Sequence, residues 1–372
     1  MNIFSGVRVL TLIKFFFPSF KAFVFWPPYI IFCYSFILLF LLRLDGIQTL
    51  RRTLIYTFPF MMYFFMSILI LDAALLIIRH SGILLMSPSL YAARTGIALT
   101  LTIIVMICAH FHAKDIKHTF YTVNIKREAG TPIRIALIAD LHIGGSTDSK
   151  WLANMVDAVN QTKPDIILLA GDIFDTDLRT MPDKDKKTEE FKQLSAPLGI
   201  YAIPGNHDVD RHSPWEAAST DGIKEFLENA GIIFLLDEVH LINEIFYLVG
   251  RRDIRPIGGG PQRKSALNLV EDLDKTKPII FMDHQPLDFR LIEEAGADLI
   301  LSGHTHKGQF FPGSIATYFI FKRAGASHYG HWRGSSAQAI ITSGISAWGP
   351  ILRLGTKSEV AVVDLNFTAT LP

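Results

Sequence analysis

The stretch Ile-Tyr-Ala-Ile-Pro-Gly-Asn-His-Asp occupies residues 200–208 and decides the fold class of this chain. Its apolar half, Ile200 to Ile203, has the length and composition of a buried strand. Its polar half, Gly205-Asn206-His207-Asp208, offers ligand and proton-transfer groups directly where that strand ends. Open α/β sheets keep their ligand sites at strand ends, so the stretch predicts an α/β domain with a site at one sheet edge.

Four further motifs place ligand side chains after apolar runs in the same way. They are Asp140-Leu141-His142, Gly171-Asp172, His284 and Gly303-His304-Thr305-His306. With the asparagine at 206 they offer carboxylate, imidazole and amide ligands and no cysteine, a set that suits divalent Mn, Fe, Zn or Mg. A single histidine is usually structural, but five such motifs in one chain predict a hydrolase centre with two divalent metal ions.

Residues from 132 onward alternate strand-length apolar runs with helix-length amphipathic stretches, which is typical of a mixed α/β domain. Strands are predicted at 133–139, 166–170, 200–203, 232–236, 245–249, 279–282, 299–302, 339–342 and 360–363. Helices are predicted at 149–161, 222–230 and 287–295. The charged run 175–192 is expected to be a solvated surface loop.

The motif order Asp-x-His, Gly-Asp, Gly-Asn-His-Asp, His, Gly-His-x-His is that of the calcineurin-like metallophosphoesterases, and residues 132–365 resemble this family. Residues 343–350 and 352–355, together with Glu359, are similar to its bacterial membrane-anchored branch. The resemblance implies a four-layer αββα sandwich, with a binuclear metal centre at the sheet edge and phosphoester hydrolysis as its reaction.

The resemblance also implies a ligand role for seven residues. One ion would be held by Asp140, His142 and His306, the other by Asn206, His284 and His304, and Asp172 would bridge them.

Two further residues are expected to be catalytic rather than metal ligands. By the same resemblance His207 would protonate the leaving oxygen or stabilise its developing charge, and Asp208 would orient the His207 ring. Asp175 is expected only to hydrogen-bond a metal ligand, without contacting the metal itself. Lys307 and Arg353 are expected to be either phosphate contacts or surface charges. The histidines that fit no metal position are His212, His240, His328 and His331.

Residues 1–113 are apolar and basic, with eight Lys/Arg and two Asp/Glu against 28 and 33 in the rest of the chain. Three uncharged or nearly uncharged segments, about 23–43, 54–78 and 95–112, are predicted to be transmembrane helices. The segment 4–20 is expected to be either a fourth span or a helix lying in the interface. Asp72, the only charge between Arg52 and Arg79, is expected to be interfacial or interhelical.

The predicted organisation is a membrane domain at 1–113, a linker at 114–131 and a catalytic domain at 132–372. Arginines 43, 51 and 52 and lysines 114 and 117 predict that the catalytic domain faces the cytoplasm. Cys33 and Cys108 lie inside predicted spans, so no disulfide framework is expected. Together with these spans, the resemblance to the bacterial membrane-anchored branch implies an integral protein of the bacterial inner or plasma membrane.

The expected function is that of a membrane-anchored, two-metal phosphoesterase. The aromatic run Phe310–Phe321 follows two metal ligands and ends in Lys322-Arg323, which suggests a lipid or lipid-linked nucleotide as substrate if the run is exposed. The alternative for the run is that it forms a strand or packs under the domain. The alternative functions are a tethered phosphatase or phosphodiesterase for a soluble nucleotide or small phosphoester, and a non-catalytic scaffold. The expected partners are the bilayer and the substrate, with no nucleic acid.

Overall fold

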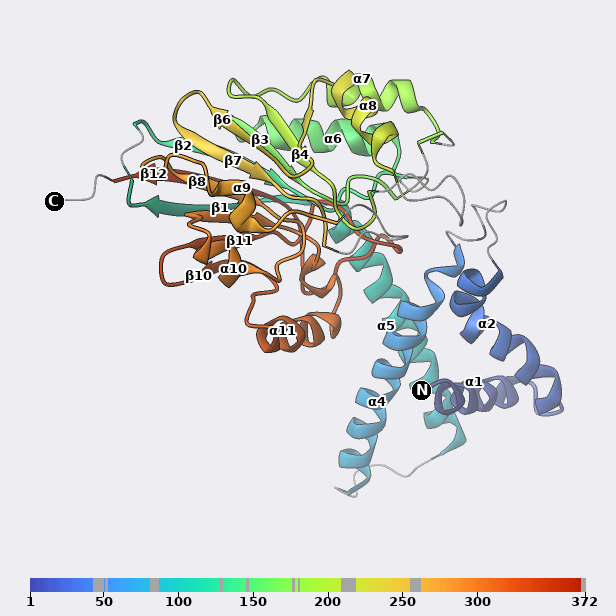
Figure 1. Ribbon diagram of the computed structural model, residues 1–372. Helices are drawn as coiled ribbons and strands as arrows, with labels where there is room; N and C mark the ends of the chain where they lie inside the picture. The colour runs from blue at the N-terminus through green and yellow to red at the C-terminus, as the bar shows by residue number, and fades with distance from the viewer. Residues whose placement is uncertain are drawn as a thin grey trace. The chain divides into compact units, whose positions relative to one another are not determined.

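The computed structural model describes residues 1–42, 50, 53–80, 87–127, 130–144, 147–175, 178–179, 181–208, 219–254 and 262–368. The chain divides into two compact units, Met1–Phe111 and His112–Pro372 (Figure 1).

The first unit is helical and apolar. Its helices are α1 (Asn2–Phe16), α2 (Ala22–Leu42), α4 (Thr57–His80) and most of α5 (Pro88–Lys114). α4 and α5 are long and apolar enough to cross a membrane, and they correspond to two of the three predicted spans. α2 corresponds to the third and is 21 residues long, with the apolar stretch Ala22–Leu38 at its start. The arginines at 43, 51 and 52 lie outside the described residues.

Asp72 of α4 lies between two arginines from neighbouring helices. Its carboxylate is 3.1 Å from Nη2 of Arg8 on α1 and also contacts Nη1 of Arg94 on α5. Arg94 is buried, so this ion pair is largely shielded from the surroundings. The position of Asp72 confirms the interhelical alternative, in which charges within an apolar helical unit are paired with each other.

The second unit contains two six-stranded mixed sheets. The first has the order β1 (Ile116–Ile125), β12 (Ser358–Phe367), β2 (Ile133–Ile138), β3 (Ile166–Ala170), β4 (Ile200–Ile203) and β5 (Ile233–Phe234). The second has the order β10 (Gly330–Arg333), β11 (Gln338–Ile341), β9 (Leu299–Ser302), β8 (Ile279–Met282), β7 (Phe246–Gly250) and β6 (Glu238–Ile242). β2 to β5 are mutually parallel, as are β7, β8, β9 and β11, so their carboxyl ends line one edge of each sheet.

Three apolar cores hold the layers together, because successive residues of a strand point to opposite faces of a sheet. Ile138 packs against α6 (Ser149–Asn160), α7 (Lys184–Phe191) and α8 (Asp221–Asn229). Its neighbour Leu137 belongs to the core between the two sheets. The outer face of the second sheet packs against α9 (Ala266–Val270) and α10 (Phe289–Glu294). This is the expected four-layer order of helices, sheet, sheet and helices (Figure 1).

Some segments differ from the predictions. The predicted linker 114–131 contains β1, which pairs with β12 over its whole length. The predicted surface loop 175–192 contains α7, because Lys187 and Phe191 are buried on one side of an otherwise charged segment. The aromatic run is a helix rather than a strand, α11 (Gly313–Arg323).

Candidate metal centre

The ends of five parallel strands deliver the predicted ligands to one place in the second unit. Asp140, Asp172 and Asn206 follow β2, β3 and β4 of the first sheet, while His284 and His304 follow β8 and β9 of the second. The turns after β2 and β3 are joined by main-chain hydrogen bonds, from Asp140 N to Gly171 O at 2.9 Å and from His142 N to Asp172 O at 3.0 Å. The two carboxylates are therefore held in fixed relation to each other.

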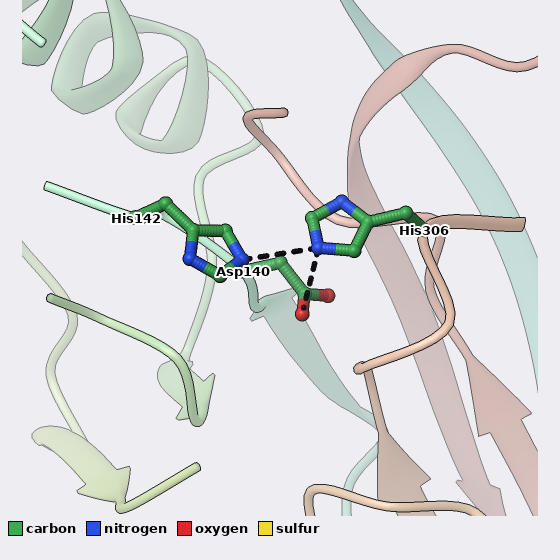
Figure 2. A group of neighbouring side chains, drawn as sticks. All are labelled: Asp140, His142 and His306. Carbon is green, nitrogen blue, oxygen red and sulfur yellow. Dashed lines mark hydrogen bonds and ion pairs between the residues drawn. The ribbon is translucent and has the colours of Figure 1, made fainter. Parts of the chain in front are cut away.

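Asp140, His142 and His306 form one group of ligand atoms, all within 4.8 Å of one another (Figure 2). Nε2 of His306 lies 3.0 Å from Nε2 of His142 and 3.5 Å from Oδ1 of Asp140. All three side chains are buried. Burial raises the pKa of Asp140 to about 6 and lowers that of His306 well below its usual value, so His306 offers a neutral imidazole with a free lone pair.

Asp172, His284 and His304 form a second group of ligand atoms within the same limit. Nε2 of His284 lies 3.2 Å from Oδ2 of Asp172, and its Nδ1 lies 2.7 Å from the Ala170 carbonyl. Burial alone would lower the pKa of His284, but the Asp172 carboxylate raises it well above its usual value. The Asp172 carboxylate thus favours positive charge beside it, which a bound divalent ion would also supply. His304 is neutral, because burial lowers its pKa to about 3.

A buried polar atom supports cation binding independently of these distances. Oδ1 of Asn206 is buried and has no hydrogen-bond partner among the described residues. An unsatisfied buried acceptor costs about 1–3 kcal/mol, so such atoms usually have a partner such as a water or an ion. Asn206 also lies close to Asp172, since the main-chain N–H of the following residue, His207, donates to Oδ1 of Asp172 at 2.8 Å. The donor set fits hard or borderline divalent cations.

Five of the predicted ligand residues adopt left-handed backbone conformations that are uncommon for residues with a side chain. Their φ angles lie between +46° and +71°, and the residues are Asp140, His142, Asp172, His304 and His306. Such residues cost roughly 1–3 kcal/mol each and cluster at functional sites. Close packing around them also requires glycine, since a Cβ at Gly205 would collide with Oδ1 of Asp172.

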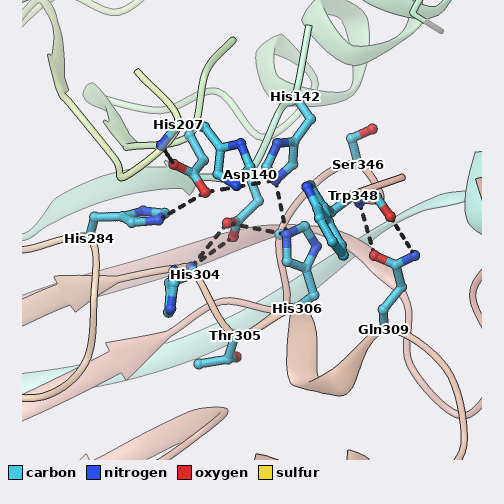
Figure 3. Close-up of polar contacts among 12 residues, drawn as sticks. Asp140, His142, His207, His284, His304, Thr305, His306, Gln309, Ser346 and Trp348 are labelled. Atoms are coloured by element: carbon cyan, nitrogen blue, oxygen red, sulfur yellow. Dashed lines mark hydrogen bonds and ion pairs between the residues drawn. The ribbon is translucent and has the colours of Figure 1, made fainter. Parts of the chain in front are cut away.

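His207 lies beside His142 of the first group, with ring centroids 5.1 Å apart (Figure 3), and is oriented by Asp175. Its Nδ1 is 3.0 Å from Oδ1 of Asp175, and the same oxygen is 2.8 Å from Nδ1 of His142. These three residues form a third group of potential ligand atoms. Burial alone would lower the pKa of His142, but Asp175 raises it to about 9. Because one oxygen serves both rings, Asp175 couples a predicted ligand to the predicted catalyst.

Asp208 does not have the predicted role of orienting His207. Its carboxylate is fully buried and accepts hydrogen bonds from the main-chain N–H groups of Gly205, Ile173 and Phe174 at 2.8–3.0 Å. The side chain therefore points back under the turns after β3 and β4 rather than toward the ring. Asp175, rather than Asp208, orients His207. In the sequence, the position of Asp175 three residues after the predicted ligand Asp172 indicates that it lies near the site.

Residues 133–308 match the family model described as calcineurin-like phosphoesterase. The second unit is a calcineurin-like phosphoesterase domain. A metallophosphoesterase of Campylobacter jejuni, uncharacterised, is 26% identical over 247 residues, which are 65% of this chain and 60% of that protein. A Danio rerio transmembrane protein with metallophosphoesterase domain is 28% identical over 248 residues, 63% of this chain and 53% of that protein. Phosphodiesterase YaeI of Escherichia coli is 28% identical over 254 residues, 64% of this chain and 84% of that protein.

The chain spans about 60% of the length of the first curated relatives it matches. The phosphoesterase domain is the shared part, since the family model lies within it. The comparisons therefore identify the family to which the domain belongs.

An exposed tryptophan of the phosphoesterase domain lies beside His207. The ring of Trp348 has its centroid 6.3 Å from that of His207, and its side chain is 44% exposed. Its main chain is clamped by Gln309, whose Oε1 accepts from Trp348 N and whose Nε2 donates to Trp348 O, both at 2.9 Å (Figure 3). Trp348 thus presents a fixed apolar surface next to the predicted catalyst, which the sequence alone did not assign.

Arg353 is neither a surface charge nor exposed toward a phosphate. Its guanidinium is fully buried and donates to the carbonyls of His306 at 2.9 Å, of Gly344 at 3.3 Å and of Ser346. It therefore ties the loop that carries His306 to the loop at 343–347. Lys307 is half-buried, with its Nζ 4.1 Å from the centre of the Tyr329 ring.

Three of the histidines that fit no predicted metal position, His240, His328 and His331, belong to none of the ligand groups found among the described residues. The fourth, His212, lies outside those residues.

The aromatic run that follows His306 is largely exposed. A 3-10 turn, η1 (His306–Gly308), leads into α11, and the two are in close contact because a Cβ at Gly308 would collide with the main chain of Gly313. The exposed side chains are Phe311, Ile315, Tyr318, Phe319 and Ile320, whereas Phe321 is buried. The alternative in which this run packs under the domain is therefore wrong for most of its length.

Proposed function

We propose that this protein is a metal-dependent phosphoesterase whose centre holds two divalent ions. The position of Asp172 carries the proposal: its Oδ2 lies 3.2 Å from Nε2 of His284 and 3.9 Å from Nε2 of His142. One carboxylate oxygen is thus close to one imidazole from each ligand group, as a bridging ligand requires. Membership of a family of metal-dependent phosphoesterases supports the same conclusion.

The ligand assignment follows from the two groups. Asp140, His142 and His306 would hold one ion, Asn206, His284 and His304 would hold the other, and Asp172 would be shared between them. Bound ions would make a water molecule acidic enough to lose a proton, so that it can attack phosphorus. They would also compensate charge on the phosphoryl oxygens.

The chain's own residues position the substrate and move the proton. His207 is only partly buried, and its Nδ1 is engaged by Asp175, so its Nε2 is free to face a phosphoester. We assign to His207 the protonation of the leaving oxygen, or the stabilisation of charge on it. Trp348 would form an apolar wall beside that leaving group. The scaffold alternative is disfavoured, because a non-catalytic relative should have lost ligands and this chain brings them together.

Metal analysis combined with an activity panel tests this proposal. Purified protein should contain divalent metal and hydrolyse bis-p-nitrophenyl phosphate or p-nitrophenyl phosphate, and Asp172→Asn should lose both turnover and metal, because it removes charge shared by two ions. Asp185→Asn, on α7 away from the ligand groups, is the matched control and should retain both. A metal-loaded wild type that cleaves no phosphoester, pyrophosphate or phosphodiester would contradict the proposal.

We also propose that the enzyme is anchored in the bacterial inner membrane, with its domain in the cytoplasm, and that it cleaves a phosphoester or pyrophosphate bond of a lipid or lipid-linked nucleotide. Two helices long and apolar enough to span a bilayer support the anchor. The exposed aromatic residues beside the loop of His306 support a lipid substrate, whose acyl part would lie near 310–321. We expect no nucleic-acid partner. The competing proposal is a tethered enzyme for a soluble nucleotide or small phosphoester.

Two substrates presented to the same variants separate these alternatives. Phe319→Ser/Ile320→Ser changes two residues that are 63% and 62% exposed, so the fold should survive. On a micellar lipid phosphodiester its kcat/KM should fall, while on a small soluble ester it should stay near that of wild type. Leu291→Ser, at a residue 60% exposed on α10, is the control and should change neither. Equal losses on both substrates, or no loss on either, would favour the soluble substrate.

A further inference from the structure

The exposed side of α11 is apolar over most of its width. At 100° per residue, the side chains of Ile315, Phe319 and Ile320 fall on one broad face, which Tyr318 extends. Phe311 lies just before the helix and is also exposed, and these five residues are 41–63% exposed. They are called here the α11 face. The opposite side carries Phe321, which is buried, so the helix is attached to the domain by one side and presents the other outward.

Positive charge lies at the C-terminal end of this face. Lys322 and Arg323 occupy the last turn of α11, and Nζ of Lys322 lies 3.1 Å from the hydroxyl of Tyr318. The sequence from 299 to 358 contains no Asp or Glu, whereas it contains six cations: Lys307, Lys322, Arg323, Arg333, Arg353 and Lys357. Arg353 is buried and engaged with carbonyls, and Lys357 is paired with Glu359 at 3.4 Å, so Lys322 and Arg323 are the cations that α11 itself presents. An exposed apolar face beside unbalanced cations attracts a partner that is apolar and anionic together.

We propose that the α11 face is an interfacial docking surface that lies in the headgroup region of an anionic bilayer. Helices that bind in the plane of a membrane combine aromatic and aliphatic side chains on one face with Lys or Arg nearby, as α11 does. Each cation near an anionic leaflet contributes about 1 kcal/mol. A protein partner or a second copy would more often match such a patch with acidic side chains, and this stretch of the chain has none to offer to a second copy of itself.

Docking of α11 would hold the metal centre at the membrane surface. η1, which begins with His306, runs directly into the segment that leads to α11, and Phe311 N donates to Leu354 O at 2.8 Å, close to the buried Arg353. The centre and the docking helix therefore belong to one connected piece of the domain. This inference goes beyond the proposed function, since it specifies a second membrane contact that is independent of hydrolysis and of the N-terminal helices.

The test uses the full-length protein reconstituted into vesicles, with an environment-sensitive fluorophore on a single cysteine. The background is Cys33→Ser/Cys108→Ser, and the probe is attached at Phe319→Cys or, as the matched control, at Leu291→Cys. Leu291 is 60% exposed and lies near Glu293 and Glu294 on α10. The vesicles are phosphatidylcholine alone or phosphatidylcholine with phosphatidylglycerol, each containing a lipid-borne quencher. Circular dichroism verifies that each labelled variant is folded.

In phosphatidylglycerol vesicles the probe at 319 should shift to shorter wavelength and be quenched, whereas the probe at 291 should do neither. Adding Lys322→Gln/Arg323→Gln should lower the ratio of docked to undocked protein about 30-fold, as expected for roughly 1 kcal/mol per cation. Equal quenching at 319 and 291 would overturn the proposal. Quenching at 319 that is independent of phosphatidylglycerol would overturn the anionic requirement. A disulfide that joins two copies of the unlabelled Phe319→Cys variant would identify the face as a self-association surface instead.

Discussion

Nδ1 of His207 lies 3.0 Å from Oδ1 of Asp175, and this contact sets the direction of the ring that is predicted to be catalytic. A carboxylate on one ring nitrogen keeps the other nitrogen directed toward the substrate side. Because the same oxygen lies 2.8 Å from Nδ1 of His142, any shift of Asp175 moves a metal ligand and the predicted proton donor together.

Replacement of Asp175 by Asn should therefore damage two functions at once. Outer partners of metal-bound histidines typically contribute 10–100-fold to affinity or activity, so we expect losses of about that size in both metal affinity and kcat. Metal titration and steady-state kinetics on the same preparation measure them. The control Asp185→Asn should resemble wild type, and a kcat loss with unchanged metal affinity would show that Asp175 serves His207 alone.

His207→Ala should lower kcat while leaving both ions in place. Removal of a general acid costs about 10²–10⁴-fold, and the ring makes no contact that the two ligand groups need. Elemental analysis beside kinetics checks the prediction, preferably with a poor leaving group, for which protonation matters most. Loss of metal from His207→Ala would mean that the group of His142, Asp175 and His207 is itself a metal site.

Asp208→Ala should affect stability more than chemistry. Three main-chain N–H groups would lose their acceptor, and each unsatisfied buried donor costs about 1–3 kcal/mol. We expect the thermal midpoint of the second unit to fall, with a smaller loss in the isosteric Asp208→Asn, which keeps one acceptor oxygen. A variant of normal stability whose pH–rate profile has changed would restore the role of orienting His207.

The sequence predicts best those strands whose side chains are buried on both faces of the sheet, because they form uninterrupted apolar runs. β2, β3, β4, β8 and β9 are short apolar runs buried on both faces, and the motifs mark their ends. β1 resembles a linker in sequence because, as an edge strand, it carries polar residues on its exposed positions. α11 is ambiguous in sequence because an aromatic run has no polar face from which helical periodicity can be recognised.

In the candidate site, the sequence predicts which residues come together but not the direction in which each side chain points. Motif order places the ligands of both groups at one sheet edge, because parallel strands bring their carboxyl ends together. It cannot decide between Asp175 and Asp208, since the direction of each carboxylate depends on the backbone of the turns after β3 and β4. The prediction for Arg353 is wrong for a similar reason: a charged residue in a loop is usually exposed, and only the packing of two loops over it buries it.

The orientation of the protein can be measured by fusions to its C-terminus. The predicted cytoplasmic domain rests on the arginines at 43, 51 and 52 and on the lysines at 114 and 117, because short loops rich in Lys and Arg stay inside. A fluorescent-protein fusion should be bright and a matched alkaline phosphatase fusion inactive. The reverse pattern would place the metal centre outside the inner membrane and would also remove the anionic cytoplasmic leaflet as the surface for α11.

Substitutions of Arg353 can distinguish a role in holding the loops of the site together from a role in binding substrate. Its guanidinium donates to the carbonyls of His306, Gly344 and Ser346, so Arg353→Leu should leave these acceptors unpaired and loosen the loop of His306. We expect lower thermal stability and weaker metal binding. Arg353→Lys should recover little of either, because an ammonium cannot reproduce the planar fork that reaches several carbonyls. If Arg353 instead bound phosphate by charge, Lys would restore KM, and metal content and stability would be unchanged in both variants.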